Sequence, residues 1–197
     1  MFKEYTQFYI QNIQSFKNRG LAYSINSNRK RIGTVQETEE SFNNTGNQLI
    51  RLTTSFISAR INAERLHLEV ADEEGTRMGS IRKEFGLEKD LILFDQDGSQ
   101  LATVISTVKM KSPALTVLDS QGNEYLNAAG TYGATDFTVA DNNGKLVSSI
   151  KKRSLVYETI KDNLLNNDVY HIDNSNHEVT FGLIGIAVAI DLYFQEG

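Results

Sequence analysis

The stretch from Val179 to Phe194 decides the fold of this chain, and it reads VTFGLIGIAVAIDLYF. Only Thr180 and Asp191 within it are polar. A membrane-spanning helix needs about 20 apolar residues and strands rarely exceed about 10, so the run is too short for the first and too long for the second. A helix that is apolar on every side must be buried on every side. The stretch therefore predicts a buried core helix over residues 176–194, with a C-terminal membrane anchor or a central strand as alternatives.

Three residues modify this expected helix. Gly182 and Gly185 lower its helix propensity but allow another part of the chain to approach its backbone closely. Asp191 is a carboxylate in an apolar setting, and such a group needs a partner or access to water. Because only six residues follow Asp191, we expect it at the helix exit, where water reaches it.

Composition limits the possible functions. The 197 residues, 40% hydrophobic and 23% charged, predict one folded domain over residues 1–197. Twenty basic and twenty-five acidic residues give a net charge of −5, which argues against nucleic acid as a partner. Without cysteine there is no disulfide, no thiolate nucleophile and no cysteine-ligated metal. We expect no cofactor and, because the N-terminus lacks the apolar stretch of a secretory signal, a cytoplasmic protein.

The N-terminal segment, residues 1–19, leaves its secondary structure open. Helical spacing places five apolar residues on one face, which favours packing against the domain, or else a helix on a membrane surface. Those residues are Phe2, Tyr5, Tyr9, Ile13 and Phe16. The alternation of Tyr9, Gln11 and Ile13 is equally consistent with a strand. Residues 3–16 are therefore either helix or strand.

A repeated turn motif occupies the middle of the chain. The pattern D-x-x-G occurs four times at intervals of 22 to 24 residues, at Asp72–Gly75, Asp95–Gly98, Asp119–Gly122 and Asp141–Gly144. Short apolar or alternating runs, such as LHLEVA and TRMGSI, precede and follow each copy. Aspartate at the first position of a type I turn accepts hydrogen bonds from the backbone ahead, and glycine adopts the left-handed conformation that ends it. Each copy therefore predicts a β-hairpin.

Looser copies extend the series, at Tyr23–Val35, Asn43–Leu52 and Val169–Asn176. Together they predict eleven or twelve strands over residues 20–173. Serial hairpins form an antiparallel meander, and closing it into a barrel removes its exposed edges. A barrel of this size encloses more space than side chains fill, and the apolar C-terminal helix is suited to occupy it. The predicted fold is mainly β: a closed antiparallel barrel of about twelve strands, wrapped round a buried hydrophobic C-terminal helix.

The serial hairpins and the ending IGIAVAIDLYF resemble the tubby C-terminal superfamily, which includes phospholipid scramblases and LURP-one-related proteins. The resemblance runs from about Gly20 to Phe194 and is nearest to the small bacterial members, whose function is mostly unassigned. It implies a twelve-stranded barrel round a hydrophobic helix. It also implies two kinds of function, because tubby domains bind phosphoinositide headgroups through basic surface residues and scramblases are associated with membranes and calcium. The scramblase calcium segment corresponds to Asp173–Glu178, which lacks a full series of calcium ligands, so calcium binding there stays open.

The hairpin order predicts that opposite charges gather at opposite ends of the barrel. The four turns place acidic residues at one rim: Asp72, Glu73, Glu74, Asp95, Asp97, Asp119 and Asp141. Basic residues fall where the outgoing strands end, and they are the candidate ligand-binding residues: Arg82, Lys83, Lys109, Lys111, Lys151, Lys152 and Arg153. Solvated strand ends that discourage edge pairing are the alternative explanation. Arg29, Lys30 and Arg31 lie beside a turn and depart from the pattern.

No reaction is indicated by the residues. The chain has no nucleophile elbow, phosphate loop or dinucleotide-binding motif. Turn chemistry accounts for the acidic rim without a metal, and His67, His171 and His177 are assigned surface or capping roles. We therefore expect neither a catalytic site nor a metal site.

The expected function is a non-enzymatic binding module that recognises anionic phospholipid headgroups or a membrane surface through its basic rim. Such a protein would be cytoplasmic and peripheral at the inner membrane face. The alternative is an intracellular interaction scaffold that binds a protein partner, through the N-terminal aromatic segment, and binds no lipid.

Overall fold

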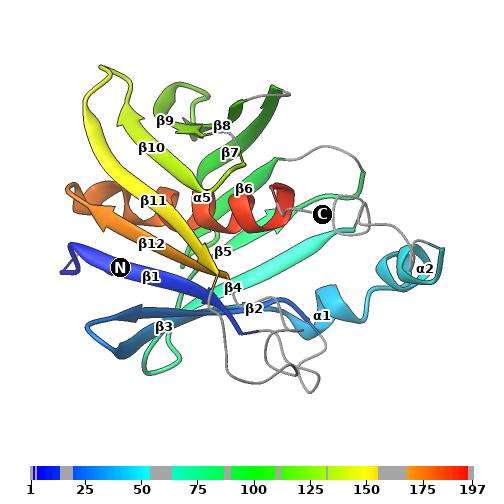
Figure 1. Ribbon diagram of the computed structural model, residues 1–197. Coiled ribbons are helices and arrows are strands. Elements are labelled where there is room, and N and C mark those ends of the chain that lie inside the picture. Colours follow the sequence, from blue (N-terminus) through cyan, green and yellow to red (C-terminus); the bar gives the residue numbers. More distant parts are fainter. Residues whose placement is uncertain are drawn as a thin grey trace.

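The computed structural model describes residues 2, 4–13, 20–53, 64–86, 90–109, 112–131, 133–154 and 168–194. Twelve antiparallel strands form a closed barrel round the C-terminal helix α5 (Thr180–Tyr193), as Figure 1 shows. Neighbours in the sequence are neighbours in the barrel, and β1 closes it by pairing with β12. The predicted fold is confirmed.

The strands alternate inward and outward side chains in the usual way, and the inward set forms the core. Their bounds are Gln7–Asn12 (β1), Ala22–Ser27 (β2), Lys30–Glu37 (β3), Leu66–Asp72 (β4), Arg77–Lys83 (β5), Leu91–Asp95 (β6), Gln100–Lys109 (β7), Ser112–Asp119 (β8), Glu124–Gly130 (β9), Asp136–Asp141 (β10), Leu146–Ser154 (β11) and Asp168–Asn174 (β12).

The four D-x-x-G turns have the expected local chemistry. In each, the aspartate Oδ1 accepts hydrogen bonds from the backbone N–H groups two and four residues ahead, at 2.8 to 3.0 Å. Each glycine has φ between 78° and 85°, where a Cβ would be strained. Because these turns join β4 to β5, β6 to β7, β8 to β9 and β10 to β11, they all lie at one end of the barrel. We call it the turn end, and the opposite end the loop end.

Lys30, one of the basic residues that depart from the charge pattern, also lies at the turn end. Asn28 and Arg29 form the β2–β3 turn there, both with positive φ. The Lys30 ammonium lies 2.6 Å from a carboxylate oxygen of Glu73. Both groups are exposed, so the pair contributes little to stability. It nevertheless explains how a basic residue is accommodated among the acidic turns.

The N-terminal segment contributes a strand, and the boundary expected at residue 20 is wrong. Strand β1 hydrogen-bonds to β2 on one side and to β12 on the other. Phe8 and Ile10 point inward and are buried, whereas Tyr9 points outward. The segment forms a strand because it pairs with a neighbour on each side and because its buried residues alternate with less buried ones. The helical spacing of its apolar residues does not decide its structure. Phe16 lies outside the described residues.

One looser repeat is a helix instead of a hairpin. Residues Thr45–Thr53 form α2, which follows the short helix α1 (Glu39–Phe42). The Asn44 Oδ1 accepts hydrogen bonds from the N–H groups of Gly46 and Asn47, and so caps α2. Capping by asparagine and an apolar period of three to four residues favour helix where a turn followed by a strand was expected.

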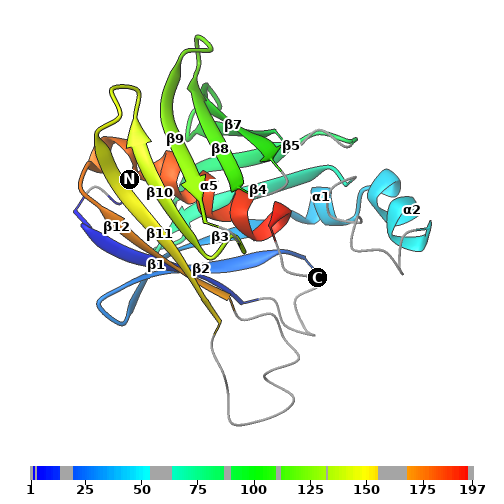
Figure 2. The ribbon, with the colours of Figure 1, turned by 45° about the horizontal axis from the view of Figure 1, so that its top comes forward.

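Helix α5 enters at the turn end and runs along the inside of the barrel to the loop end, as Figures 1 and 2 show. It packs on β6, β7, β8 and β12. The α-helix begins at Thr180, after a 3-10 turn over His177–Val179, slightly later than predicted. Its thirteen residues from Thr180 to Leu192 are all buried. Within the ranges described, no helix combines the length and apolarity needed to span a bilayer.

The two glycines of α5 lie where side chains of the barrel wall approach the helix closely. A Cβ added at Gly182 would lie 2.6 Å from Tyr125 Oη, and one added at Gly185 would lie 3.0 Å from both Leu93 methyl groups. The expected close approach is confirmed. Glycine lowers the helix propensity at these two positions, but a larger side chain there would not fit between the helix and the barrel wall.

Asp191 is not at a solvated exit, which corrects the sequence interpretation. Its side chain is fully buried near the loop end. Oδ1 accepts a hydrogen bond from Tyr170 Oη at 2.7 Å, and Oδ2 accepts from Tyr23 Oη at 2.8 Å and from Asn12 Nδ2 at 3.2 Å. These donors come from β12, β2 and β1, so the carboxylate joins the helix to the closing strands of the barrel.

Candidate anion-binding pocket at the loop end

Two of the seven predicted basic residues point into the barrel. Lys83, the last residue of β5, is 1% exposed, and its ammonium donates to three backbone carbonyls. Lys152 on β11 forms an ion pair with Asp168 at 2.8 Å, and both side chains are almost buried. Neither ammonium is presented to a surface ligand. The pattern of charges identified the strand ends but not which face of the strand each residue occupies.

Three of the other predicted side chains are described, and they lie on two strands, β5 and β11. Lys151 is exposed, and Arg153 forms an exposed ion pair with Asp136 at 3.2 Å. Lys109 ends β7, but its side chain is not described, and Lys111 lies outside the described residues. Arg82 lines a pocket. The predicted residues whose side chains are described therefore do not gather at one site, and Arg82 is the one of them that lines the pocket described next.

That pocket lies on the outer face of β4 and β5, beneath α1, and its volume is about 160 Å³. It brings together residues far apart in the sequence: Glu40, Ser41, Asn44, Arg65, Leu66, His67 and Arg82. Two arginines, one histidine and one glutamate are among these residues. We call it the arginine pocket.

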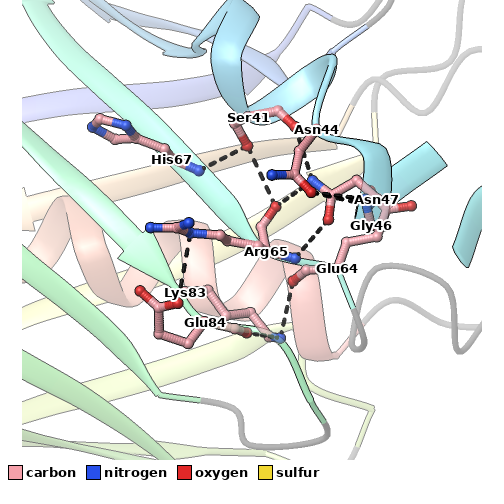
Figure 3. A network of polar contacts seen from close by, with 9 residues as sticks. All are labelled: Ser41, Asn44, Gly46, Asn47, Glu64, Arg65, His67, Lys83 and Glu84. Atoms are coloured by element: carbon pink, nitrogen blue, oxygen red, sulfur yellow. Dashed lines mark hydrogen bonds and ion pairs between the residues drawn. The ribbon is translucent and has the colours of Figure 1, made fainter. Parts of the chain in front are cut away.

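A buried polar network holds the wall of the pocket in place (Figure 3). Ser41 Oγ accepts a hydrogen bond from His67 N–H at 3.0 Å and lies 3.1 Å from Glu37 Oε1. The Asn47 side chain bonds both backbone groups of Arg65, accepting from its N–H at 2.9 Å and donating to its carbonyl at 2.6 Å. These contacts fix α1 and the start of α2 against β4. The Arg65 and His67 side chains consequently project from a rigid backbone.

Arg82 is held in an unusual way. Its guanidinium carbon lies 4.5 Å from the centre of the Phe94 ring, a cation–π contact that fixes its position. Its Nε is buried and has no hydrogen-bond partner. A buried donor without an acceptor costs free energy, because it has lost water and gained nothing. Arg82 is also one of the residues that line the pocket, so an acceptor that reached its Nε from there would remove that cost.

Arg65, the residue just before β4, also lines the arginine pocket. Its Nε lies 3.5 Å from a Glu84 carboxylate oxygen, and this ion pair is largely exposed (Figure 3). The pair orients the guanidinium but contributes little to stability in water. Glu40 is the one carboxylate in the pocket lining, which also contains Arg65 and Arg82, and Glu84 is paired with Arg65.

His67 faces Arg82 across the β4–β5 ladder. Burial lowers its pKa below the usual value, and the charges of Arg82 and Arg77 lower it further. The imidazole therefore binds a proton less readily than a free histidine does, and a negative charge arriving beside it would favour the protonated form. Sequence reasoning gave His67 a surface role and left out Arg65, Ser41 and Asn44, because no local motif connects residues 40–44 with residues 65–67 and 82.

The basic lining of the arginine pocket distinguishes it from two other hollows on the barrel. Each of these two lies beside Asp173 on the outer face and contains no arginine or lysine. Asp173 itself accepts hydrogen bonds from Gln7 and Ser149. Across the residues described, no three histidine, aspartate or glutamate side chains lie together as a metal ion would require.

Comparison with known proteins shows the fold. No protein-family model matches the chain, and no curated protein does. A solved X-ray structure of the Arabidopsis thaliana protein AT5G01750 is similar, with a TM-score of 0.52 and 13% sequence identity over 94% of this chain and 91% of that one. At this identity the likeness concerns the barrel and its central helix alone.

Proposed function

We propose that this chain is a non-enzymatic binding module whose arginine pocket receives the phosphate of an anionic phospholipid headgroup. The observation that carries the proposal is the buried, unpartnered Nε of Arg82 in a pocket shared with Arg65 and His67. Guanidinium groups bind phosphate oxygens through two parallel N–H donors, and such charge-assisted bonds are about twice as strong as neutral ones.

Two further considerations support this function. The pocket volume of about 160 Å³ is large enough to hold a headgroup phosphate. The resemblance to the tubby C-terminal superfamily points to phosphorylated lipid headgroups as a ligand class. Under this proposal the protein is peripheral at the inner membrane face, and the basic surface is centred on Arg82 instead of being spread round the rim.

The scaffold alternative relied on the N-terminal aromatic segment as a docking surface. Phe8 and Ile10 of that segment are buried in the barrel wall. Deleting residues 1–16 to look for loss of a bound partner would also remove β1 and open the barrel. Such a deletion would therefore not distinguish a lost binding surface from a lost fold.

We expect Arg82→Gln to weaken binding to anionic vesicles by roughly tenfold or more, because one charge-assisted interaction is lost. The measurement is co-sedimentation with vesicles of phosphatidylcholine, with and without phosphatidylinositol phosphate, across a salt series. Arg153→Gln is the matched control, since Arg153 is an exposed arginine at the same end, paired with Asp136. Equal binding by Arg82→Gln and the wild type would refute the proposal.

A bound anion should raise the pKa of His67. Burial and Arg82 hold that pKa below its usual value in the free protein. By linkage, the anion must then bind more tightly as pH falls through the His67 pKa. Sulfate is the suitable probe, since its own charge is constant over this range. NMR titration of the imidazole, with and without sulfate, measures the shift, and His171 and His177 serve as internal controls. An unchanged His67 titration at saturating sulfate would contradict the proposed site.

A further inference from the structure

An apolar pair lies next to the arginine pocket. In the part of the chain described, four large apolar side chains are exposed, and two of them, Leu49 and Phe85, are 63% and 45% exposed at the loop end. The other two, Leu101 and Leu146, follow D-x-x-G turns and so lie at the turn end.

Leu49 and Phe85 lie close together because Phe85 packs on α2. A Cβ added at Gly46 would lie 2.8 Å from Phe85 Cζ, so the ring rests directly on that glycine. Leu49 follows Gly46 by three residues and therefore shares its helix face. The same turn of α2 borders the pocket, because Asn44, which accepts from Gly46 N–H, is a pocket residue. Figures 1 and 2 show α2 projecting away from the barrel at this end.

Phe85 is also held rigidly. The Lys83 ammonium donates to the carbonyls on both sides of it, Glu84 O at 3.0 Å and Gly86 O at 3.1 Å. Gly86 has φ of 116°, which closes the backbone round the ammonium. Phe85 follows Arg82 by three positions, so one short segment carries both the apolar ring and the guanidinium whose Nε has no partner.

We propose that Phe85 and Leu49 enter the interfacial layer of an anionic bilayer while the arginine pocket binds a headgroup phosphate of the same membrane. Aromatic and leucine side chains favour that layer, and arginine beside them is attracted to its negative charge. The charge of the adjoining pocket favours a lipid surface over an apolar protein groove as the occupant. The inference rests on the proposed function and names the surface through which it acts.

Tryptophan fluorescence tests the insertion directly, because the chain contains no tryptophan. In Phe85→Trp the emission should shift to the blue on addition of phosphatidylcholine–phosphatidylserine vesicles and be quenched by lipid-attached quenchers. Leu146→Trp, at the turn end, should show neither change. An unshifted Phe85→Trp, or equal shifts in the two variants, would overturn the inference.

A second pair of variants separates this inference from the proposed function. Phe85→Ser should weaken vesicle binding by roughly tenfold through loss of apolar burial, whereas Leu146→Ser should not. Both should retain the sulfate-induced shift of His67. Unchanged vesicle binding by Phe85→Ser would overturn insertion alone. Absence of the sulfate shift from the wild type, with blue-shifted Phe85→Trp, would refute the pocket and leave insertion standing.

Discussion

Asp191→Ala should lower the free energy of unfolding by about 3 kcal/mol, because it leaves the buried hydroxyls of Tyr23 and Tyr170 without their acceptor. The measurement is urea or guanidinium unfolding monitored by the circular dichroism of the barrel. Asp173→Ala is the control: Asp173 is an exposed aspartate that accepts hydrogen bonds from Gln7 and Ser149. We expect that variant to change stability by less than about 1 kcal/mol. Similar losses in the two variants would refute the importance of the buried network.

The same residue should give the barrel a distinctive pH dependence. Burial raises the pKa of Asp191, and the hydrogen bonds from Tyr170 and Tyr23 oppose this rise without cancelling it. The folded protein therefore holds the proton to a higher pH than the unfolded chain does. The stability linked to this group is fully present below the unfolded pKa, about 3.9, and falls as pH rises to the folded pKa.

Asp191→Asn isolates this contribution, because it removes the ionisation while keeping the side-chain shape. The wild type minus Asp191→Asn difference in unfolding free energy should decrease as pH rises from about 4 and then become constant. Other carboxylates cancel in the difference. A difference that increases with pH would show that the carboxylate is stabilised, not destabilised, by its surroundings.

Lys83→Met should destabilise the protein by about 3 kcal/mol, since a buried ammonium bound to three carbonyls would be replaced by a thioether. The carbonyls belong to Glu64, Glu84 and Gly86, at 3.2, 3.0 and 3.1 Å from Nζ. They connect the start of β4 with the segment after β5, and these two flank the arginine pocket. Methionine keeps the length of the apolar stem, so the change removes the donors with little change in packing.

The matched control is Lys151→Met, an exposed lysine on β11 at the same end. We expect it to alter stability by less than about 0.5 kcal/mol. Thermal or chemical unfolding of both variants provides the comparison. If Lys83→Met were as stable as Lys151→Met, the three carbonyls would be satisfied equally well without the ammonium.

Local chemistry was enough to predict much of the fold. Aspartate and glycine specify the four turns through contacts within five residues of chain, so Asp72–Gly75 and its three copies were recognisable without knowledge of the rest. The unbroken apolar run of α5 indicated full burial by composition alone. The number of hairpins then implied a barrel wide enough to hold it.

The candidate site was only partly predictable. Arg82 was identified from its position at a strand end, but Arg65, His67, Ser41 and Asn44 were not. These residues come together with Arg82 only because α1 folds back onto β4. No sequence pattern within residues 40–67 indicates that contact. The helix α2 was also missed. Asn43–Gly46 resembles the repeated turns and Leu49–Leu52 is mostly apolar, so in isolation this stretch reads as a turn followed by a strand.

By itself, the sequence determined the turns, the approximate number of strands and the burial of the C-terminal helix, because each depends on neighbouring residues or on bulk composition. Only the tertiary structure decided which way the strand-end side chains point. The register of barrel closure turns Lys83 and Lys152 inward and leaves Arg82 outside, and in a strand a shift of one residue reverses every such assignment. It also brings Asn12, Tyr23 and Tyr170 round Asp191, because partners separated by up to 179 residues meet only once the barrel is closed.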